Sequence, residues 1–219
     1  REATEADIER VIAAFARAAG RCAEAGLDGI ELHGAHGYLL SQFLSTVYNQ
    51  RSDRWGGSLS NRARLIREVC RAVRRAAPSL VLAVRLSPED FAQSKGLDLD
   101  ESIEVACQLA DDGMDVLHLS LWRAQRMTTK RPSEHPTPLF RAGLPPNVRI
   151  VVAGAIWTRE DADAQLALGA DAVALGRAAI GNADWPGHIQ QGRPIRRPPF
   201  SPAALAAEGF QAGACGRAR

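Results

Sequence analysis

Apolar residues recur along this chain at two spacings, and each spacing predicts one kind of element. From Ile8 to Cys22 they follow the i, i+3, i+4, i+7 spacing of an amphipathic helix, which Thr4 and Asp7 begin with a capping box and Gly26 ends. Short apolar runs between helices have the length of buried strands. Further helices are predicted over 61–76, 100–110 and 158–168, and strands over 29–32, 80–86, 115–120, 149–153 and 171–175.

Helix and strand therefore alternate, which makes the fold class α/β. The same Gly-x-Asp sequence precedes three of the strands and indicates a weak internal repeat of βα units. It occurs at Gly26-Leu27-Asp28, Gly113-Met114-Asp115 and Gly169-Ala170-Asp171. Strands that are apolar on both faces and separated by helices predict a parallel sheet covered by helices. This pattern leaves a choice between a barrel and a doubly wound sheet.

The linker between Leu121 and Asn147 is long and rich in proline, which forbids a continuous helix and predicts an excursion over a site. No second domain is indicated. Residues 193–219 form a tail rich in Arg, Pro and Ala. We expect this tail to wrap the preceding domain, to fray or to reach a neighbouring subunit, so homo-oligomerisation stays open.

Composition and charge exclude several classes of protein. With 46% hydrophobic and 24% charged residues, the 219-residue chain is an ordinary globular domain rather than a disordered one. Its formal net charge of +2 is spread along the chain, so nucleic acid is not an expected partner. No apolar run approaches the roughly 20 residues that span a bilayer. We therefore expect a cytoplasmic protein that does not enter membranes.

The four cysteines are far apart and form no C-x-x-C pair, so neither zinc nor an iron-sulfur cluster is predicted. Cys22, Cys70 and Cys107 lie in helical patterns and are expected to be small buried apolar residues. Cys215 lies in the tail.

The densest chemistry follows the first predicted strand, in the segment His33-Gly34-Ala35-His36-Gly37-Tyr38. In parallel α/β folds, ligands bind at the carboxyl ends of strands, where this segment lies. A glycine-containing turn can bring the imidazoles of His33 and His36 to one side, so that both polarise a single carbonyl oxygen. The phenol of Tyr38 can deliver a proton. The structural alternative is a pair of histidines that cap the strand, beside a core tyrosine.

This segment resembles the old yellow enzyme family of FMN-dependent (β/α)8-barrel oxidoreductases. The resemblance is carried by AGLDGIELHGAHGYLLSQFLS and NQRSDRWGGSLSNRARLI and extends over nearly the whole chain. It implies that His33 and His36 hydrogen-bond the carbonyl or nitro oxygen of the substrate, and that Tyr38 protonates the substrate α-carbon. Because Asn replaces the second histidine in some branches, His36 places the chain nearer the His-His branch. Trp55 stands where Tyr is commoner, which we interpret as a packing variation.

Arg85 lies inside an apolar predicted strand, where a lone charge costs several kcal/mol without an anionic partner. The resemblance implies that its partner is the N1/O2 edge of the flavin, where negative charge collects on reduction. Taken without the resemblance, an ion pair with a barrel carboxylate such as Glu31 is the simpler interpretation.

The last two predicted strands end in Ala153-Gly154-Ala155 and Leu175-Gly176-Arg177. In many barrels the loops after strands seven and eight bind a phosphate through backbone N–H groups, which glycine lets the ligand approach. Arg177 can add a charge-assisted hydrogen bond. With Asn182-Ala183-Asp184-Trp185-Pro186 after it, this region resembles the phosphate end of the family. The predicted FMN-binding residues are therefore Arg85, Ala153, Gly154, Gly176 and Arg177.

The resemblance also implies a reaction. NAD(P)H would reduce FMN, and a hydride would then pass to the β-carbon of an enone or a similar small molecule with an electron-poor double bond, in a ping-pong scheme. A second hypothesis is another FMN barrel, such as a dihydroorotate or dihydrouridine oxidoreductase. That enzyme would share the phosphate end without needing His33, His36 and Tyr38. The third hypothesis is a truncated barrel that serves as a non-catalytic remnant or assembly module.

Chain length bears on these alternatives. A TIM barrel needs eight strands and roughly 250 residues, whereas about five strands are predicted within these 219 residues. Residues 1–192 are therefore interpreted as the last five βα units of an FMN-binding (β/α)8 TIM barrel. Because the chain begins with Arg1 rather than Met, we expect a longer polypeptide to supply the first three strands. The 219 residues alone are not expected to form a closed flavin enzyme.

Overall fold

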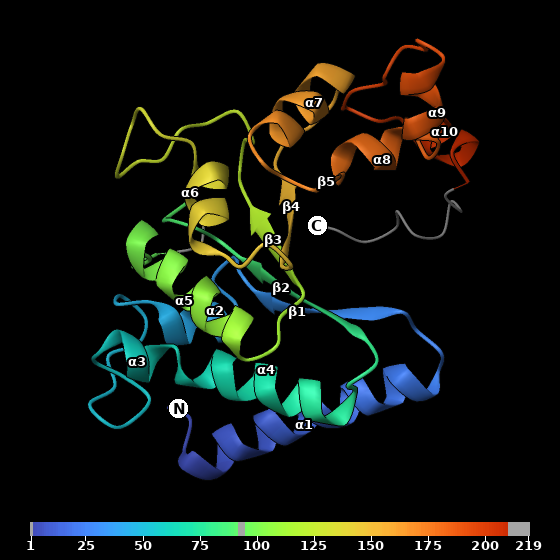
Figure 1. Cartoon of the computed structure of the whole chain (residues 1–219). Helices are drawn as coiled ribbons and strands as arrows, with labels where there is room; N and C mark the ends of the chain where they lie inside the picture. The colour runs from blue at the N-terminus through green and yellow to red at the C-terminus, as the bar shows by residue number, and fades with distance from the viewer. Residues whose placement is uncertain (1, 92–94, 210–219) are drawn as a thin grey trace.

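The computed structural model describes residues 2–91 and 95–209, which surround one parallel sheet (Figure 1). Within these residues, five strands pair in the order β1-β2-β3-β4-β5, so each strand lies beside its neighbour in sequence. A doubly wound sheet reverses its strand order part-way, whereas a barrel does not. The strict sequential order therefore favours a barrel segment. The strands are β1 (Gly29–Gly34), β2 (Val81–Leu86), β3 (Val116–Ser120), β4 (Arg149–Ala153) and β5 (Ala172–Ala174).

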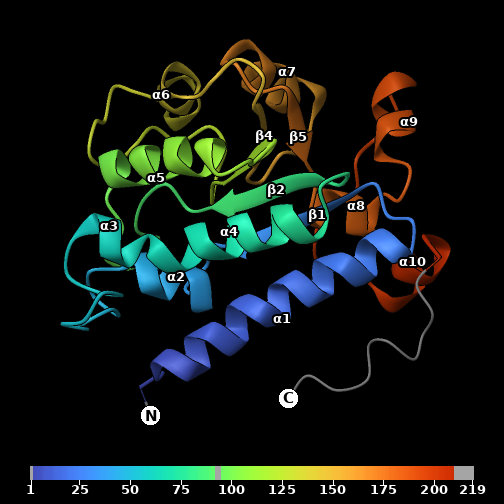
Figure 2. The same ribbon diagram turned by 60° about the horizontal axis from the view of Figure 1, so that its bottom comes forward.

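Helices connect the strands and cover one face of the sheet. Figure 2 shows the longest of them, α1, lying beside α4 beneath the strands. No helix in residues 2–91 and 95–209 is long and apolar enough to cross a membrane. The helices are α1 (Glu5–Glu24), α2 (Leu39–Leu44), α3 (Leu59–Arg62), α4 (Arg64–Ala76), α5 (Leu99–Asp111), α6 (Pro136–Gly143), α7 (Arg159–Ala167), α8 (Arg177–Gly181), α9 (Trp185–Gln190) and α10 (Pro202–Ala207).

The predicted start and stop signals of the first helix are confirmed. The Thr4 hydroxyl accepts a hydrogen bond from the Asp7 backbone N–H at 3.2 Å, and the Asp7 carboxylate accepts one from the Thr4 N–H at 2.9 Å. Gly26 has a φ of 74°, which glycine adopts without strain. Trp55, interpreted as a packing variation, is fully buried and donates its indole N–H to Glu5 at 2.6 Å. It therefore ties the loop before α3 to α1.

The Gly-x-Asp repeat also has a structural cause. Gly113 and Gly169 have φ values of 99° and 100°, so each turn needs a residue that tolerates the left-handed region. The carboxylate of Asp115 accepts the backbone N–H of Leu82 at 2.8 Å, and Asp171 does the same for Ile150 at 2.7 Å. The repeated aspartate therefore fastens the start of one strand to the start of its neighbour.

The expectation that the strands are apolar on both faces is wrong for β1, β2 and β3. Alternate residues such as Leu32, Val84 and Leu119 are buried in the core. The opposite face of these three strands carries polar side chains toward the strand ends, where the register aligns His33 with Arg85 and Arg85 with His118. That face lines a cavity at the carboxyl ends of the strands. The alternation of polar and apolar residues along the strands therefore reflects this cavity on one face and the packing of the helices on the other.

Most predicted bounds agree with the structure to within about one residue, and three elements differ in more than that. β1 continues to Gly34, so His33 belongs to the strand and not to the loop after it. The helix predicted over 61–76 is two helices, α3 and α4, that meet at Ala63. The proline-rich linker contains α6, because His135 caps its first turn and Pro136 stands at a position where a helix tolerates proline.

Two of the three described cysteines are less buried than expected. Cys70 is buried, whereas Cys22 and Cys107 are half-buried. Burial raises the pKa of the Cys70 thiol to about 12, which keeps it protonated and unreactive. Cys215 lies outside the described residues.

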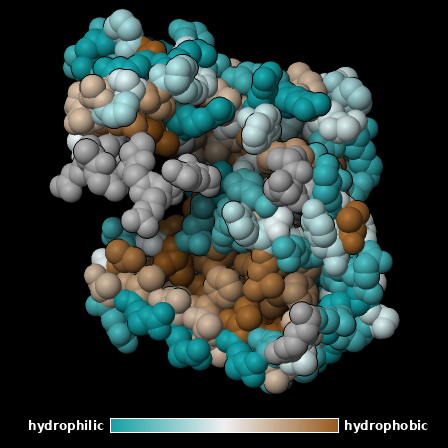
Figure 3. Space-filling view, turned by 180° about the vertical axis from the view of Figure 1, so that it is seen from behind, coloured by the Kyte–Doolittle hydropathy of each residue, from teal (hydrophilic) through white to brown (hydrophobic). Residues whose placement is uncertain are grey.

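The sheet is open at both sides. Among the described residues, β1 and β5 each pair with one neighbour, so the outer edge of each has unpaired backbone groups. Figure 3 shows apolar side chains gathered over the lower part of the face seen from behind. Both features are those of a barrel segment whose remaining strands are not present.

Candidate functional site

A cavity of about 410 Å³ lies at the carboxyl ends of the strands. Its wall includes residues from β2 to β5 and from the loop after β1. The cavity brings together most of the residues singled out from the sequence, although they come from four separate strand ends. Those that line it are His36, Tyr38, Arg85, Ala153, Gly154, Gly176 and Arg177.

His33, His36 and Tyr38 form a cluster of three rings, of which His36 and Tyr38 line this cavity and His33 does not. The His33 and His36 ring centroids are 4.9 Å apart, with the rings edge to face, and the centroids of His33 and Tyr38 are 5.5 Å apart. His36 has a φ of 61°, an uncommon backbone conformation for a residue with a side chain. This turn brings the ring of His36 back beside that of His33, as the sequence interpretation required.

The surroundings of both imidazoles favour their neutral form. Burial, followed by the positive charge of Arg85, lowers the pKa of His33 and of His36 below the ordinary value of 6.5. A neutral imidazole has one N–H donor and one acceptor nitrogen. Each ring can therefore donate a hydrogen bond to a substrate oxygen without carrying a charge. Tyr38 is 64% exposed, so its phenol lies at the open side of the cluster.

Ser120, at the end of β3, was not found from the sequence and joins two of the predicted residues. Its Oγ lies 2.6 Å from His36 Nε2 and accepts a hydrogen bond from Arg85 Nη2 at 3.0 Å. Because arginine only donates, the Ser120 hydroxyl hydrogen is free to be donated to His36. When the hydroxyl donates in this way, the His36 proton lies on Nδ1. The position of Ser120 at a strand end is the one signal by which the sequence could have indicated it.

Arg85 does not form the ion pair with Glu31 that the sequence alone favoured. The Glu31 carboxylate instead accepts a hydrogen bond from His118 Nδ1 at 2.7 Å. This hydrogen bond, together with the nearby charge of Arg85, lowers the pKa of Glu31 despite its partial burial. Arg85 Nε is buried and has no partner among the described residues. The guanidinium therefore has a donor available for an acceptor that is not part of the chain.

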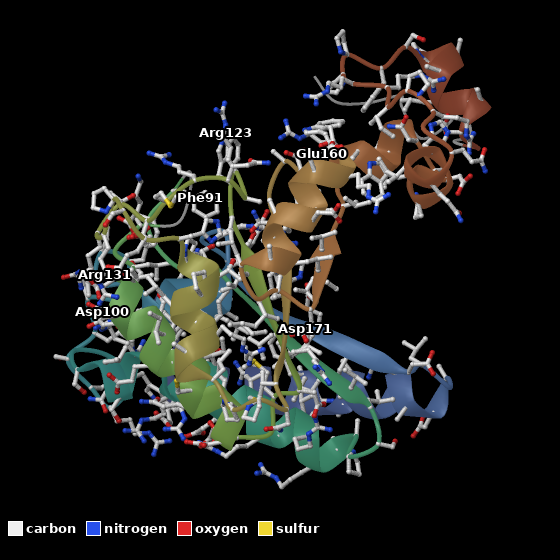
Figure 4. The ribbon with its side chains drawn as sticks, turned by 45° about the horizontal axis from the view of Figure 1, so that its top comes forward. Phe91, Asp100, Arg123, Arg131, Glu160 and Asp171 are labelled. Carbon is white, nitrogen blue, oxygen red and sulfur yellow. The ribbon has the colours of Figure 1, made fainter. Side chains whose placement is uncertain are left out.

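Two aromatic rings from loops narrow the cavity beside the histidines. Phe91, which follows β2, lies 6.4 Å from His36 and 6.2 Å from Trp122, which follows β3, measured between ring centroids. Both rings line the cavity. Figure 4 shows Phe91 and Arg123 at the same end of the molecule. Sequence reasoning missed both aromatic residues because nothing in a loop pattern indicates which side chains turn inward.

The two glycines at the other end of the cavity serve different purposes. A Cβ on Gly154 would lie 2.5 Å from the backbone oxygen of Leu121, so the packing of the loop after β3 already requires glycine there. A Cβ on Gly176 would meet no atom within 4 Å and would project into open space. Gly176 therefore leaves room for a ligand to approach the backbone. Arg177 follows directly, with its guanidinium carbon 5.9 Å from the centre of the Trp157 ring.

Comparison with known proteins decides the family. Residues 1–196 match the model of the NADH:flavin oxidoreductase / NADH oxidase family. The chain belongs to this family. It is 34% identical over 200 residues to the probable NADH-dependent flavin oxidoreductase YqiG of Bacillus subtilis, covering 88% of this chain and 54% of that protein. It is 36% identical over 201 residues to the NADH oxidase of Thermoanaerobacter brockii, covering 88% of this chain and 31% of that protein.

Solved members of the family have the same fold. The old yellow enzyme homologue of Zymomonas mobilis superposes with a TM-score of 0.79 at 28% identity, over 96% of this chain and 61% of that one. Morphinone reductase in complex with tetrahydroNAD gives 0.76 at 30% identity, over 94% of this chain and 54% of that one. The chain thus spans about half the length of these family members. Its five-stranded sheet is part of a (β/α)8 barrel.

The cofactor implied by this NADH:flavin oxidoreductase family is FMN, with NADH or NADPH as the reductant. The residues present fit a flavin at two points. The partnerless Nε of Arg85 offers a donor to an electron-rich edge, and the open space at Gly176 beside Arg177 offers room for a terminal phosphate. The resemblance noted from the sequence and the family membership therefore agree.

Proposed function

We propose that the complete protein reduces activated carbon–carbon double bonds, as in enones, with FMN as its cofactor and NAD(P)H as its reductant. The observation that carries this proposal is the ring cluster of His33, His36 and Tyr38, of which His36 and Tyr38 line the same cavity as Arg85. An FMN barrel that acts on another substrate class has no need of this cluster.

His33 and His36 would hold the carbonyl oxygen of the acceptor. Their lowered pKa values keep both rings neutral, so each donates one N–H to the oxygen on which negative charge develops. The hydroxyl of Ser120 fixes the His36 ring from behind through Nε2. Because the His36 ring is held before the substrate arrives, this donor needs little reorganisation during the reaction.

Tyr38 would supply the proton. Reduction adds a hydride to the β-carbon and a proton to the α-carbon of the acceptor, while NAD(P)H is oxidised to NAD(P)⁺. FMN supplies the hydride-transfer chemistry when it is bound. The phenol of Tyr38 lies beside His33 at the exposed side of the cluster, where it can be reprotonated from solvent after each turnover.

Arg85 would place a positive charge against the flavin edge that becomes electron-rich on reduction. Its guanidinium is half-buried, is held by Ser120 and retains an unsatisfied N–H at Nε. We further propose a ping-pong order, in which the reductant leaves before the acceptor binds over the same histidines.

Chromatography of the flavin released from the complete protein, followed by enone reduction, tests this function. We expect FMN rather than FAD, because Gly154, Gly176 and Arg177 surround room for a single terminal phosphate. Arg177→Ala should weaken FMN retention more than it alters the chemistry of bound flavin. FAD as the dominant species, or FMN without any enone reduction, would contradict the proposal.

A further inference from the structure

The segment after α9 brings a second arginine over the ring of Trp157, a residue that lines the cavity beside Arg177. The guanidinium carbon of Arg197 lies 5.2 Å from the centre of the Trp157 ring, over which Arg177 also lies at 5.9 Å. The two guanidinium groups are therefore at most about 11 Å apart, which is the sum of those distances. Trp157 is only 8% exposed and lines the cavity together with Arg177.

The backbone next to Arg197 is held firmly. Asn182 is 1% exposed, and its side-chain amide accepts the Arg196 backbone N–H at 2.8 Å and donates to the Arg196 carbonyl at 3.0 Å. Phe200 packs so closely on Gly181 that a Cβ there would lie 2.3 Å from the ring. The segment 196–200 is thus fastened to α8, the helix that begins with Arg177. The described part of the tail therefore contacts α8.

Neither arginine over Trp157 has an anionic partner. In residues 2–91 and 95–209, Arg177 and Arg197 make no ion pair or side-chain hydrogen bond, whereas Arg193 pairs with Asp184 at 2.9 Å and Arg196 with Glu208 at 3.1 Å. A guanidinium that lies over an aromatic ring uses its face, so its in-plane N–H donors stay free. Those donors match the oxygens of a phosphate.

The charge of Arg197 lowers the pKa of one nearby carboxylate, that of Asp161, but the two side chains form no ion pair in the described residues. Its carboxylate accepts the backbone N–H groups of Trp157 at 2.9 Å and Thr158 at 3.1 Å, and the amide of Gln125 at 2.8 Å. Burial raises the pKa of Asp161, while these N–H groups and the charge of Arg197 lower it, with a net downward shift. The Asp161 oxygens are thus already used, and the guanidinium of Arg197 stays available.

We propose that Arg197 is a second arginine of the phosphate site, which binds the terminal phosphate of FMN together with Arg177. The inference rests on the proposed function for the identity of the ligand. Arg197 lies just outside residues 1–196, which match the family model, so family membership does not assign it. The tail then has a role in holding the cofactor and does not only cover the barrel.

Titration of the flavin-free complete protein with FMN and with riboflavin, followed by fluorescence, tests this assignment. Riboflavin lacks the phosphate, so its affinity measures the contacts of the site other than those of the two arginines with the phosphate. Arg197→Ala should weaken FMN binding about tenfold or more, the effect of losing one charge-assisted hydrogen bond, and should leave riboflavin binding unchanged. Arg197→Lys should keep part of the affinity, because lysine retains the charge but not the planar set of donors.

Arg193→Ala is the matched control, since it removes the same charge from the same segment at a residue paired with Asp184. It should bind both flavins as the wild type does. Equal weakening of FMN and riboflavin by Arg197→Ala would mean that Arg197 only packs on Trp157, and would overturn the proposal. Unchanged FMN binding with a raised KM for NADPH but not for NADH would assign the site to the phosphate of the reductant, and would overturn it as well.

The two proposals fail in different ways. A complete protein that prefers FMN to riboflavin through Arg197 but reduces no enone supports the phosphate site and contradicts the proposed function. If the complete protein reduces enones with FMN and Arg197→Ala leaves its affinity for FMN unchanged, the proposed function stands and the inference on Arg197 is contradicted.

Discussion

Ser120→Ala offers a sharp test of the polar network at the strand ends. The Ser120 hydroxyl is 2% exposed and contacts His36 Nε2 at 2.6 Å and Arg85 Nη2 at 3.0 Å. Among the described residues it is the one hydrogen-bond partner of the Arg85 side chain, whose Nε is already unsatisfied. The substitution therefore leaves a half-buried guanidinium without any partner in the flavin-free protein.

The size of the effect follows from these contacts. Losing a hydrogen bond to a charged group costs about 1.5–3 kcal/mol, and losing a neutral one costs about 1 kcal/mol. We expect Ser120→Ala to lower the free energy of unfolding by about 2–4 kcal/mol. Ser41→Ala is the matched control, because Ser41 is equally buried at 2% but donates only to the carbonyl oxygens of Ala35 and Tyr38. It should cost about 1 kcal/mol.

A double-mutant cycle in urea isolates the Arg85 contribution. In the Arg85→Met variant there is no guanidinium to lose its hydrogen-bond partner. Ser120→Ala should then lower the free energy of unfolding only by the hydrogen bond to His36, about 1 kcal/mol. The flavin-free complete protein is unfolded with urea, and the transition is followed by tryptophan fluorescence and circular dichroism. Equal costs of Ser120→Ala in both backgrounds would refute the argument that Arg85 depends on this hydroxyl.

Three further predictions concern the ring cluster. Replacing both His33 and His36 with Ala should slow oxidation of the reduced flavin by an enone by about 10²- to 10³-fold, measured by stopped flow, if the two rings act as oxyanion donors. Tyr38→Phe should slow the same half-reaction by roughly 10²- to 10⁴-fold and affect flavin reduction by NAD(P)H less; slowing of the reductive half alone would show that Tyr38 is not the proton donor. Because burial and the charge of Arg85 lower the pKa of both histidines below 6.5, the unfolded chain takes up protons first on acidification. The free energy of unfolding should therefore fall as the pH drops below about 6.5 and keep its full value above it, and urea titrations should show a shallower fall in the double histidine variant.

Local features of this fold were readable from the sequence because their causes lie within a few residues. The capping box of Thr4 and Asp7 and the turn at Gly26 depend on hydrogen bonds and φ values inside one helix. Hydrophobic spacing depends on the period of each element, so the order of helices and strands followed directly. Even the approach of His33 to His36 is local, since the two residues are three positions apart and one turn brings their rings together.

Family resemblance supplied what periodicity could not. The segments around His33 and Trp55 indicated a barrel and a flavin, and the family match over residues 1–196 and the solved homologues confirmed both. The alternation of polar and apolar residues along the strands was misjudged, because polar side chains facing a site interrupt the pattern expected of a buried strand. The individual roles of the site residues stay predictions until the variants are measured.

Only the tertiary structure decided which distant side chains meet. His36 and Ser120 are separated by 84 positions, and the strand register, rather than any sequence motif, brings them together. On the same face of the sheet, the Glu31 carboxylate accepts a hydrogen bond from His118, and Arg85 Nε is left without an acceptor. Several polar groups lie together on this face, so the packing of the whole sheet decides which of them pair. Arg197 lies over Trp157 because Asn182 fastens the tail to α8. The sequence by itself determined the elements and their chemistry, since these depend on short-range spacing, whereas pairing across the sheet depends on how the whole chain packs.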